Sequence, residues 1–214
     1  MSKAAIIVAS GSSRRMGFDK LSAEIHGKPV LWHSVYAFSS LDDVSQVIVV
    51  TSPERFAWLS DLGPKLIRVD GGAERPDSVA AGLVALQDDV THVAIHDGAR
   101  PLVSPASILA TFRAAEKSGA ASLARRVTET LKRATPEGIT TDSVSRDYLW
   151  IMETPQVFSK DLILRSYAQV QSGDAHITDE VSALQLLGQG TTLVENPSPN
   201  PKITVQADLD SIRA

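Results

Sequence analysis

Cysteine is absent from the 214 residues, and this excludes disulfides, thiolate metal sites and a cysteine nucleophile. No apolar run approaches the ~20 residues that span a bilayer, so we expect no membrane partner. Neither sign of charge dominates, since the formal net charge is −4 at pH 7, and this argues against a general nucleic-acid-binding protein. The chain runs from Met1-Ser2-Lys3 straight into an apolar strand without a signal-peptide pattern, which predicts a cytoplasmic location.

The length and the hydrophobic content of 43% suit one domain with a sizeable core. In the first half, short apolar runs alternate with apolar residues at helical spacing. We expect strands at 4–9, 44–51, 66–69 and 91–96, and helices at 30–40, 54–62, 77–87 and 105–117. This order predicts an α/β fold with a doubly wound, mostly parallel sheet and helices on both faces.

The pattern changes after residue 119. Strand or ribbon segments are expected at 120–124, 127–133, 138–144, 191–194 and 202–205, with an extended stretch at 146–157 and helices at 161–172, 178–187 and 207–213. The sequence shows no internal repeat and no low-complexity segment, so a repeat architecture is not expected.

The stretch from residue 4 to residue 20 is the strongest functional signal. Its apolar strand leads into Ser10-Gly11-Ser12-Ser13, a turn whose small side chains leave backbone N–H groups open to an anion. Arg14, Arg15 and Lys20 follow, and cations so close together repel one another unless an anion lies between them. The spacing matches neither a P-loop nor a dinucleotide fingerprint. It favours a phosphate or polyphosphate site, the alternative being a solvated basic turn.

Two further segments follow predicted strands and therefore lie at the same edge of a parallel sheet, where ligands bind. Gly71-Gly72-Ala73 lets the backbone approach a flat base, and Ser78 either donates to a ligand or, like Asp77, caps the next helix. Asp97 is placed either to meet Mg²⁺ beside phosphates or to form a structural ion pair with Arg100. The scattered histidines show no zinc-ligand spacing, so no protein-held metal site is expected.

Polar residues of the second half can meet an anionic polyol, and three of them, Glu129, Thr178 and Lys202, also have a purely structural interpretation. Glu129 is either a surface charge on a ribbon or a substrate contact. Arg146 and Thr154 offer a guanidinium and a hydroxyl. Thr178 opens a helix, where it either faces an anion or, like Asp179, caps the helix. Lys202 either faces solvent or points from an alternating strand into the cleft.

Taken in order, several segments resemble the motifs of cytidylyltransferases: Ala9-Ser10-Gly11-Ser12-Ser13-Arg14-Arg15-Met16-Gly17, Gly71-Gly72-x-x-Arg75-x-x-Ser78-Val79, His96-Asp97-x-Ala99-Arg100-Pro101, Thr154-Pro155-Gln156, Thr178-Asp179-Glu180 and Asn200-x-Lys202-Ile203-Thr204. The resemblance covers nearly the whole chain and is to the 2-C-methyl-D-erythritol 4-phosphate cytidylyltransferase family. It implies one Rossmann-like nucleotidyltransferase domain over 1–214, with a protruding β-arm at roughly 127–150 that is used in dimerisation.

The resemblance also implies roles for individual residues. CTP would be bound by Ala9, Ser10, Gly11, Gly72, Ala73, Ser78 and Asp97, with Mg²⁺ held mainly through the CTP phosphates. The catalytic charges would come from Arg15, Lys20 and Lys202. The polyol phosphate would contact Glu129, Arg146, Thr154, Thr178 and Lys202. In a homodimer the arm would reach into the site of the neighbouring subunit.

The chain departs from the family pattern at several positions. Ser10 stands where alanine is usual, and Asp19 stands where a proline precedes the loop lysine. Glu129 replaces an aspartate, and Glu153 replaces a common glutamine. None of these changes removes a charge assigned to catalysis. Two other functions stay open: a ribitol 5-phosphate cytidylyltransferase, and a non-catalytic nucleotide-binding regulatory domain on the same scaffold.

Overall fold

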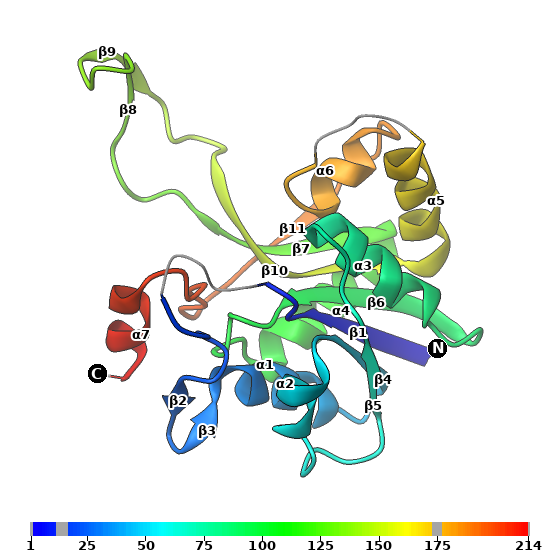
Figure 1. Cartoon of the computed structure of the whole chain (residues 1–214). Helices are drawn as coiled ribbons and strands as arrows, with labels where there is room; N and C mark the ends of the chain where they lie inside the picture. The colour runs from blue at the N-terminus through cyan, green and yellow to red at the C-terminus, as the bar shows by residue number, and fades with distance from the viewer. Residues whose placement is uncertain (1, 12–16, 173–176, 214) are drawn as a thin grey trace.

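The computed structural model describes residues 2–11, 17–172 and 177–213. Its centre is a seven-stranded sheet in the order β11-β7-β10-β6-β1-β4-β5 (Figure 1). The strands are β1 (Ser2–Val8), β4 (Val44–Val50), β5 (Leu66–Val69), β6 (Val90–Asp97), β7 (Ala120–Arg126), β10 (Trp150–Ser159) and β11 (Thr192–Glu195). Neighbouring strands pair in parallel except at β10, which is antiparallel to both β6 and β7. The expected mostly parallel α/β sheet is confirmed.

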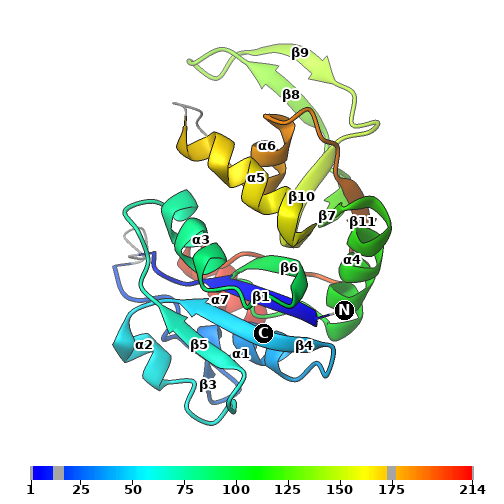
Figure 2. The ribbon, with the colours of Figure 1, turned by 90° about the vertical axis from the view of Figure 1, so that its right-hand side faces the viewer.

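Helices cover both faces of this sheet (Figure 2). One core contains side chains of α1 (Val30–Ser39), α4 (Pro105–Ser118) and α7 (Gln206–Arg213), with Phe56 of the short α2 (Pro53–Ala57) against it. The other core contains side chains of α3 (Arg75–Val84), α5 (Lys160–Gln171) and α6 (Glu180–Gln185). Strand β1 serves both, since Ala5 and Ile7 join the first core and Ala4 and Ile6 the second. This explains its unbroken apolar run.

Helix α4 shows how local sequence sets the ends of an element. The Ser104 hydroxyl oxygen accepts from the Ser107 N–H at 3.1 Å, and Pro105 occupies the first turn, where an N–H has no helical partner. Gly119 follows the last turn with a positive φ of 82°, a conformation that glycine adopts without a steric penalty. A serine cap of this kind contributes about 1 kcal/mol.

Helix α3 begins earlier than the sequence predicts. Its N-cap residue is Glu74, so neither Asp77 nor Ser78 is the N-cap. Asp77 instead joins the cap from inside the helix, since its carboxylate accepts from the Glu74 N–H at 2.9 Å. The helix then packs closely on the sheet because Gly82 has no side chain. A Cβ there would lie 2.7 Å from Cγ2 of Ile6.

Residues 202–205 do not form the expected strand. The N–H groups of Thr204 and Val205 instead donate to the Asp208 carboxylate, at 2.7 and 3.0 Å, near the start of α7. The Ile203 N–H donates to the Ala99 carbonyl at 2.9 Å, and the Ile203 side chain is fully buried. This segment is therefore fixed by capping bonds and a buried side chain rather than by sheet pairing.

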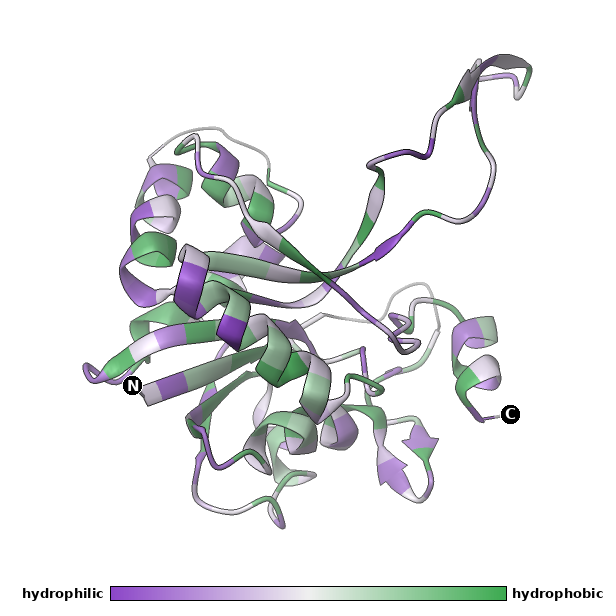
Figure 3. Ribbon diagram, turned by 180° about the vertical axis from the view of Figure 1, so that it is seen from behind, coloured by the Kyte–Doolittle hydropathy of each residue, from purple (hydrophilic) through white to green (hydrophobic). Residues whose placement is uncertain are grey.

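Two ribbons lie outside the main sheet. The antiparallel strands β8 (Leu131–Ala134) and β9 (Thr140–Val144) project away from it at the end of long connections (Figures 1 and 3). This arm lies within the predicted 127–150 segment, and its residues are mostly exposed. A smaller hairpin pairs β2 (Glu24–Ile25) with β3 (Lys28–Pro29).

Within the described ranges, no helix combines the length and the apolar character needed to cross a membrane.

The first four parallel strands of the chain decide where a ligand can bind. They stand in the sheet as β5-β4-β1-β6, so the chain winds to one side after β1 and to the other side after β5. The carboxyl ends of β1 and β6 therefore open a crevice at the point where the winding reverses. Val8 and Asp97 are register partners at this end.

Candidate active site

A cavity of about 600 Å³ lies at this crevice. Its lining includes Ser10 and Gly11 after β1, Lys20, Gly72 and Ala73 before α3, Asp97 at the end of β6, and Lys202. The loop, the turn and the strand end singled out in the sequence thus meet, together with a segment from near the other end of the chain.

A smaller cavity of about 300 Å³ adjoins the first. The two share Arg75, Asp97 and Lys202 in their linings. Thr154 and Thr178 line only the smaller one. The arrangement can hold two ligands that meet at the shared residues.

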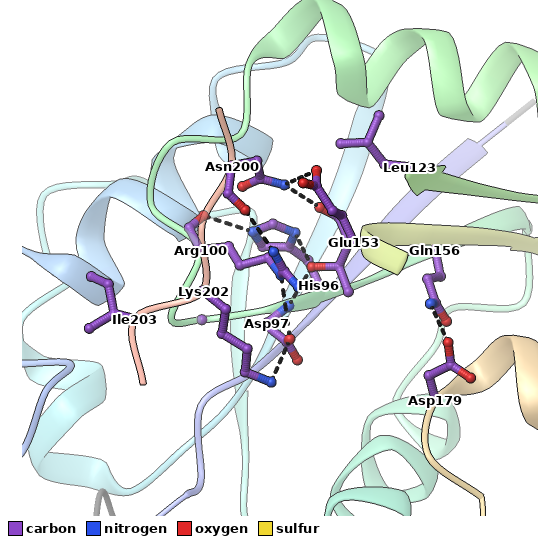
Figure 4. A network of polar contacts seen from close by, with 12 residues as sticks. His96, Asp97, Arg100, Leu123, Glu153, Gln156, Asp179, Asn200, Lys202 and Ile203 are labelled. Carbon is purple, nitrogen blue, oxygen red and sulfur yellow. Dashed lines mark hydrogen bonds and ion pairs between the residues drawn. The ribbon is translucent and has the colours of Figure 1, made fainter. Parts of the chain in front are cut away.

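Asp97 lies in the lining of both cavities, among three cations. Figure 4 shows it beside Lys202 and Arg100. Its Oδ2 lies 2.8 Å from Lys202 Nζ and 3.7 Å from Arg100 Nε, and its Oδ1 lies 3.3 Å from Arg75 Nε. Burial alone would raise the pKa of Asp97, but the charges of Arg75, Lys202 and Arg100 outweigh it and hold the pKa well below its usual range. The expected ion pair with Arg100 is present as part of this larger cluster.

Arg75 has a structural role that the sequence did not reveal. Its guanidinium makes two hydrogen bonds to the Glu180 carboxylate, at 2.7 and 3.0 Å, and thereby ties α3 to α6. Glu180 is fully buried and also accepts from the Tyr167 hydroxyl at 3.0 Å. Burial opposes the charge of Arg75, but Glu180 and Asp97 more than offset it and raise the pKa of Arg75. Both residues stood in recognised motifs, yet nothing in their spacing indicated that they pair.

The double glycine before α3 is required by contacts inside the protein. A Cβ on Gly71 would lie 2.4 Å from Cβ of Ser10, and a Cβ on Gly72 would lie 2.2 Å from Cβ of Asp77. The hydroxyls of Ser10 and Ser78 are 2.8 Å apart, and the Gly72 N–H donates to Ser78 Oγ at 3.2 Å. Ser78 is buried and joins the two ligand-facing turns. Its contact with a ligand stays a prediction.

Arg55 of α2 holds both ends of the first loop, which the sequence did not suggest. Its Nε lies 2.7 Å from Asp19 Oδ2, while Nη1 and Nη2 donate to the carbonyls of Ala9 and Gly11 at 2.5 and 3.0 Å. Asp19 is the residue that replaces the proline usual before the loop lysine. Its carboxylate pairs with Arg55 in the structure.

Lys20 and Lys202 come from opposite ends of the chain and line the same cavity. Lys20 Nζ donates to the carbonyl of Ile203, the residue after Lys202, at 2.6 Å. Two of the three predicted catalytic cations are therefore brought together. The third, Arg15, lies with the rest of 12–16 outside the described residues, so its role stays a prediction.

Thr154 belongs to a buried network behind Asp97. His96 Nε2 lies 3.1 Å from the carbonyl of Arg100, which only accepts, so this nitrogen carries the proton. His96 Nδ1 then accepts from the Thr154 hydroxyl at 2.9 Å, and that hydroxyl oxygen accepts from the Asp97 N–H at 3.1 Å. Burial lowers the pKa of His96 to about 4. Thr154 therefore fixes the backbone of Asp97 through this hydrogen bond. Its contact with a polyol stays a prediction.

The predicted polyol contacts divide into two groups. Thr178 and Thr154 line the smaller cavity, and the Thr178 hydroxyl lies 2.9 Å from the Ser182 hydroxyl. Glu129 and Arg146 lie on the exposed connections to the arm and are in neither lining. The Arg146 guanidinium donates to the Thr128 carbonyl. The structure therefore does not bring Glu129 and Arg146 to the cleft of their own chain.

A sequence profile of 2-C-methyl-D-erythritol 4-phosphate cytidylyltransferase matches residues 3–214. The chain belongs to this family. It is 37% identical to the 2-C-methyl-D-erythritol 4-phosphate cytidylyltransferase of Pelotomaculum thermopropionicum, over 96% of this chain and 90% of that protein. Identity to the enzyme of the same name from Caldanaerobacter subterraneus subsp. tengcongensis is also 37%, over 98% and 96%.

Solved structures agree. The crystal structure of 4-diphosphocytidyl-2C-methyl-D-erythritol synthase from Anaerococcus prevotii is similar to this chain, with a TM-score of 0.87 at 27% identity, over 99% of this chain and 94% of that one. The Francisella tularensis 2-C-methyl-D-erythritol 4-phosphate cytidylyltransferase gives a TM-score of 0.85 at 28% identity, over 99% and 98%. The family and the fold expected from the motifs are confirmed.

The Mg²⁺ implied by the likeness to this cytidylyltransferase family can be judged on the donors present. Among the described residues, no group of three or more His, Cys, Asp or Glu is arranged to hold a metal ion. Asp97 and Glu74 are the carboxylates in the larger cavity's described lining. Mg²⁺ is commonly bound by one or two carboxylates together with phosphate oxygens and waters. The donors fit an ion that arrives with a polyphosphate.

Because His96 is buried and neutral, we expect the free energy of unfolding to fall in acid. The pKa of His96 falls from 6.5 to about 4 on folding, so protons bind the unfolded chain more readily below pH 6.5. Its contribution to the free energy of unfolding is complete above that pH and falls by about 3 kcal/mol on going to pH 4. Urea unfolding at pH 7 and pH 4 measures the loss. We expect His96→Gln to lose about that much less than the wild type, and an equal loss in both proteins would contradict this.

Proposed function

We propose that this chain joins CTP to 2-C-methyl-D-erythritol 4-phosphate, giving 4-diphosphocytidyl-2-C-methyl-D-erythritol and pyrophosphate in non-mevalonate isoprenoid synthesis. Family membership over residues 3–214 supports the enzyme class and both substrates. The observation that carries the proposal is that two adjoining cavities share Arg75, Asp97 and Lys202. A cytoplasmic location stays a prediction from the sequence.

We assign CTP to the larger cavity and the polyol phosphate to the smaller one. Backbone N–H groups of the turn that starts at Ala9, Ser10 and Gly11 would bind the CTP phosphates. Gly72 and Ala73 line the same cavity and would contact cytosine. The second phosphate would then approach the α-phosphorus of CTP beside Lys202, which lines both cavities.

The reaction is an in-line displacement at phosphorus. A phosphate oxygen of the polyol substrate forms the new bond to the α-phosphorus, and the bond to the leaving pyrophosphate breaks. This oxygen is already anionic, so the obstacle is charge repulsion rather than proton removal. A cation ~4 Å from the developing charge interacts by roughly 4 kcal/mol at an effective dielectric constant of ~20. Half of that, realised only in the transition state, exceeds a tenfold gain in rate.

Mg²⁺ would be held mainly by the CTP phosphates, with Asp97 as the carboxylate that meets the ion or its waters. It would neutralise part of the polyphosphate charge. The ion pairs to Arg75 and Lys202 keep Asp97 ionised for that contact.

Pyrophosphate release, measured for each nucleoside triphosphate with each of two polyol phosphates, tests the function. We expect turnover with CTP and 2-C-methyl-D-erythritol 4-phosphate, at least about 10-fold faster than with ribitol 5-phosphate. Chelation of divalent cations should stop it. Faster turnover of ribitol 5-phosphate would overturn the substrate assignment. Tight CTP binding without turnover would support a regulatory domain instead.

Lys20→Ala and Lys202→Ala test the electrostatic mechanism. Each variant should lower kcat by about 10²-fold, because each removes a cation aimed at charge that develops during the reaction. The dissociation constant for CTP, measured by calorimetry, should change far less. Lys28→Ala is the matched control, because Lys28 lies on the β2–β3 hairpin, outside both cavity linings, and pairs with Asp61. Unchanged kcat in both cleft variants would refute the assignment.

A homodimer would complete the site. Glu129 and Arg146 stand on the arm's connections, outside both described cavity linings of their own chain. A second copy would place them at the neighbouring cleft, where Arg146 offers a guanidinium suited to a phosphate. The long exposed ribbon of β8 and β9 provides surface for that contact (Figure 1).

Subunit mixing tests this proposal. In a mixed dimer of Arg146→Ala and Lys202→Ala chains, one of the two sites combines an intact Lys202 from one chain with an intact Arg146 from the other. Refolding the two weakly active variants together should therefore give more activity than either alone. Light scattering should report a dimer. A monomer, or a mixture no more active than its components, would contradict the shared site.

A further inference from the structure

The segment 196–204, called here the lysine strap, carries Lys202 into the cleft without helix or strand structure. Close to the lysine, Ile203 donates its N–H to the Ala99 carbonyl at 2.9 Å and accepts from Lys20 at 2.6 Å. A segment that does not join a sheet ladder depends on individual contacts for its position. The polar contacts of Asn200, two residues before Lys202, are among the contacts that set this position.

Asn200 anchors the strap just before Lys202. The residue is 2% exposed, and its amide donates to the Thr154 carbonyl at 2.9 Å and to the Glu153 carboxylate at 3.3 Å. Its backbone carbonyl accepts from Arg100 Nη1 at 2.6 Å. Figure 4 shows the Asn200 side chain directed toward Glu153, on the strand beside β6, while the strap continues past it to Lys202.

Glu153 is the second half of this anchor. It is 3% exposed, and the Asn196 amide donates to its Oε2 at 2.8 Å, so one carboxylate holds the strap at two points. Arg125 lies 3.8 Å from its other oxygen. Burying a carboxylate is costly, and Asn200 Oδ1 is itself buried without a hydrogen-bond partner among the described residues. An apolar contact between the strap and β10 would stabilise the fold at least as well as this buried polar one. The polar contact between Asn200 and Glu153 therefore favours a role in positioning the strap.

We propose that Asn200 and Glu153 are positioning residues that set the strap so that Lys202 Nζ reaches both ligands. The proposal rests on the catalytic role of Lys202 given above. Asn200 acts through the lysine and does not itself touch substrate. Loss of the anchor therefore costs rate only while the lysine is present, which a purely structural contact would not do.

A double-mutant cycle in kcat tests the proposal. Asn200→Ala should lower kcat by about 10²-fold, the loss that a ~1 Å misplacement of a catalytic group brings, with a smaller change in KM for CTP. In a Lys202→Ala background the same change should have almost no further effect. Ser198→Ala, on the exposed part of the strap, is the control that leaves kcat unchanged.

The outcomes separate the two proposals. If Lys202→Ala leaves kcat unchanged, the role of Lys202 is wrong and the anchor has no lysine to place. If Lys202→Ala lowers kcat but Asn200→Ala does not, or if the two losses multiply, the positioning role is overturned while the catalytic role stands.

A pair of variants that exchanges the amide and the carboxylate tests the proposal if Asn200→Ala fails to fold. Asn200→Asp places two carboxylates together and should lower kcat, because like charges repel within the anchor. Adding Glu153→Gln restores one donor and one acceptor across the same contact. Both variants lose the amide that donates to the Thr154 carbonyl, so any gain of the double variant over Asn200→Asp reports the contact with residue 153. The double variant should recover part of the kcat lost by Asn200→Asp, with thermal melting as the check on folding. Absence of recovery in a folded double variant would overturn the pairing.

Discussion

One buried carboxylate organises the cleft. Asp97 stands at the end of β6 with Arg75, Arg100 and Lys202 around it, and these cations come from separate parts of the chain. Without this carboxylate they would repel one another across a space that is partly closed to water. With it, these four side chains lie together and still carry a net positive charge before any phosphate arrives. The same ion pairs hold the pKa of Asp97 low, so the arrangement keeps its charge across the range in which most proteins are stable.

The position of Asp97 in turn follows from hydrogen bonds that carry no net charge. Its N–H donates to Thr154, the Thr154 hydroxyl donates to neutral His96, and His96 donates to the carbonyl of Arg100. Each group in this chain has a defined donor or acceptor role, which fixes the histidine tautomer. Protonating His96 would place a second donor opposite the Thr154 hydroxyl and bury a charge. The backbone on both sides of Asp97 therefore depends on a histidine that stays neutral.

The sequence predicted the parts of the site whose signals are local. The buried strand before Ser10, the glycines at 71 and 72, and the carboxylate at the end of β6 were all predictable from periodicity and turn chemistry. The topology of a doubly wound sheet placed them at one edge. The resemblance placed Lys202 in the cleft, where it lies, but the alternating strand expected to carry it there does not form. The alternation at 202–205 was real, but the Asp208 carboxylate takes the N–H groups of Thr204 and Val205 that a strand would need.

Other features had no local signal. Arg75 and Glu180 lie 105 positions apart, and their pairing depends on how α3 and α6 pack on the sheet. The direction of β10 was equally hidden, because an apolar extended stretch has the same composition whether it runs parallel or antiparallel to its neighbours. Nothing in the sequence distinguished Arg55 from the other residues of the helix expected at 54–62. Its three hydrogen bonds to the first loop exist only because that loop returns past α2.

Three of the residues that depart from the family pattern form hydrogen bonds or ion pairs within this chain. Ser10 contributes a hydroxyl that meets Ser78, and Asp19 contributes a carboxylate that meets Arg55. Glu153 contributes a carboxylate that receives the amides of the strap. The hydroxyl added at Ser10, the carboxylate added at Asp19 and the charge added at Glu153 are each bonded to protein beside the cleft. A buried polar group that is satisfied in this way fixes its neighbours in one arrangement, because every alternative leaves it without a bond. These three side chains therefore help to fix segments that border the cleft, and none of the substitutions removes one of its cations.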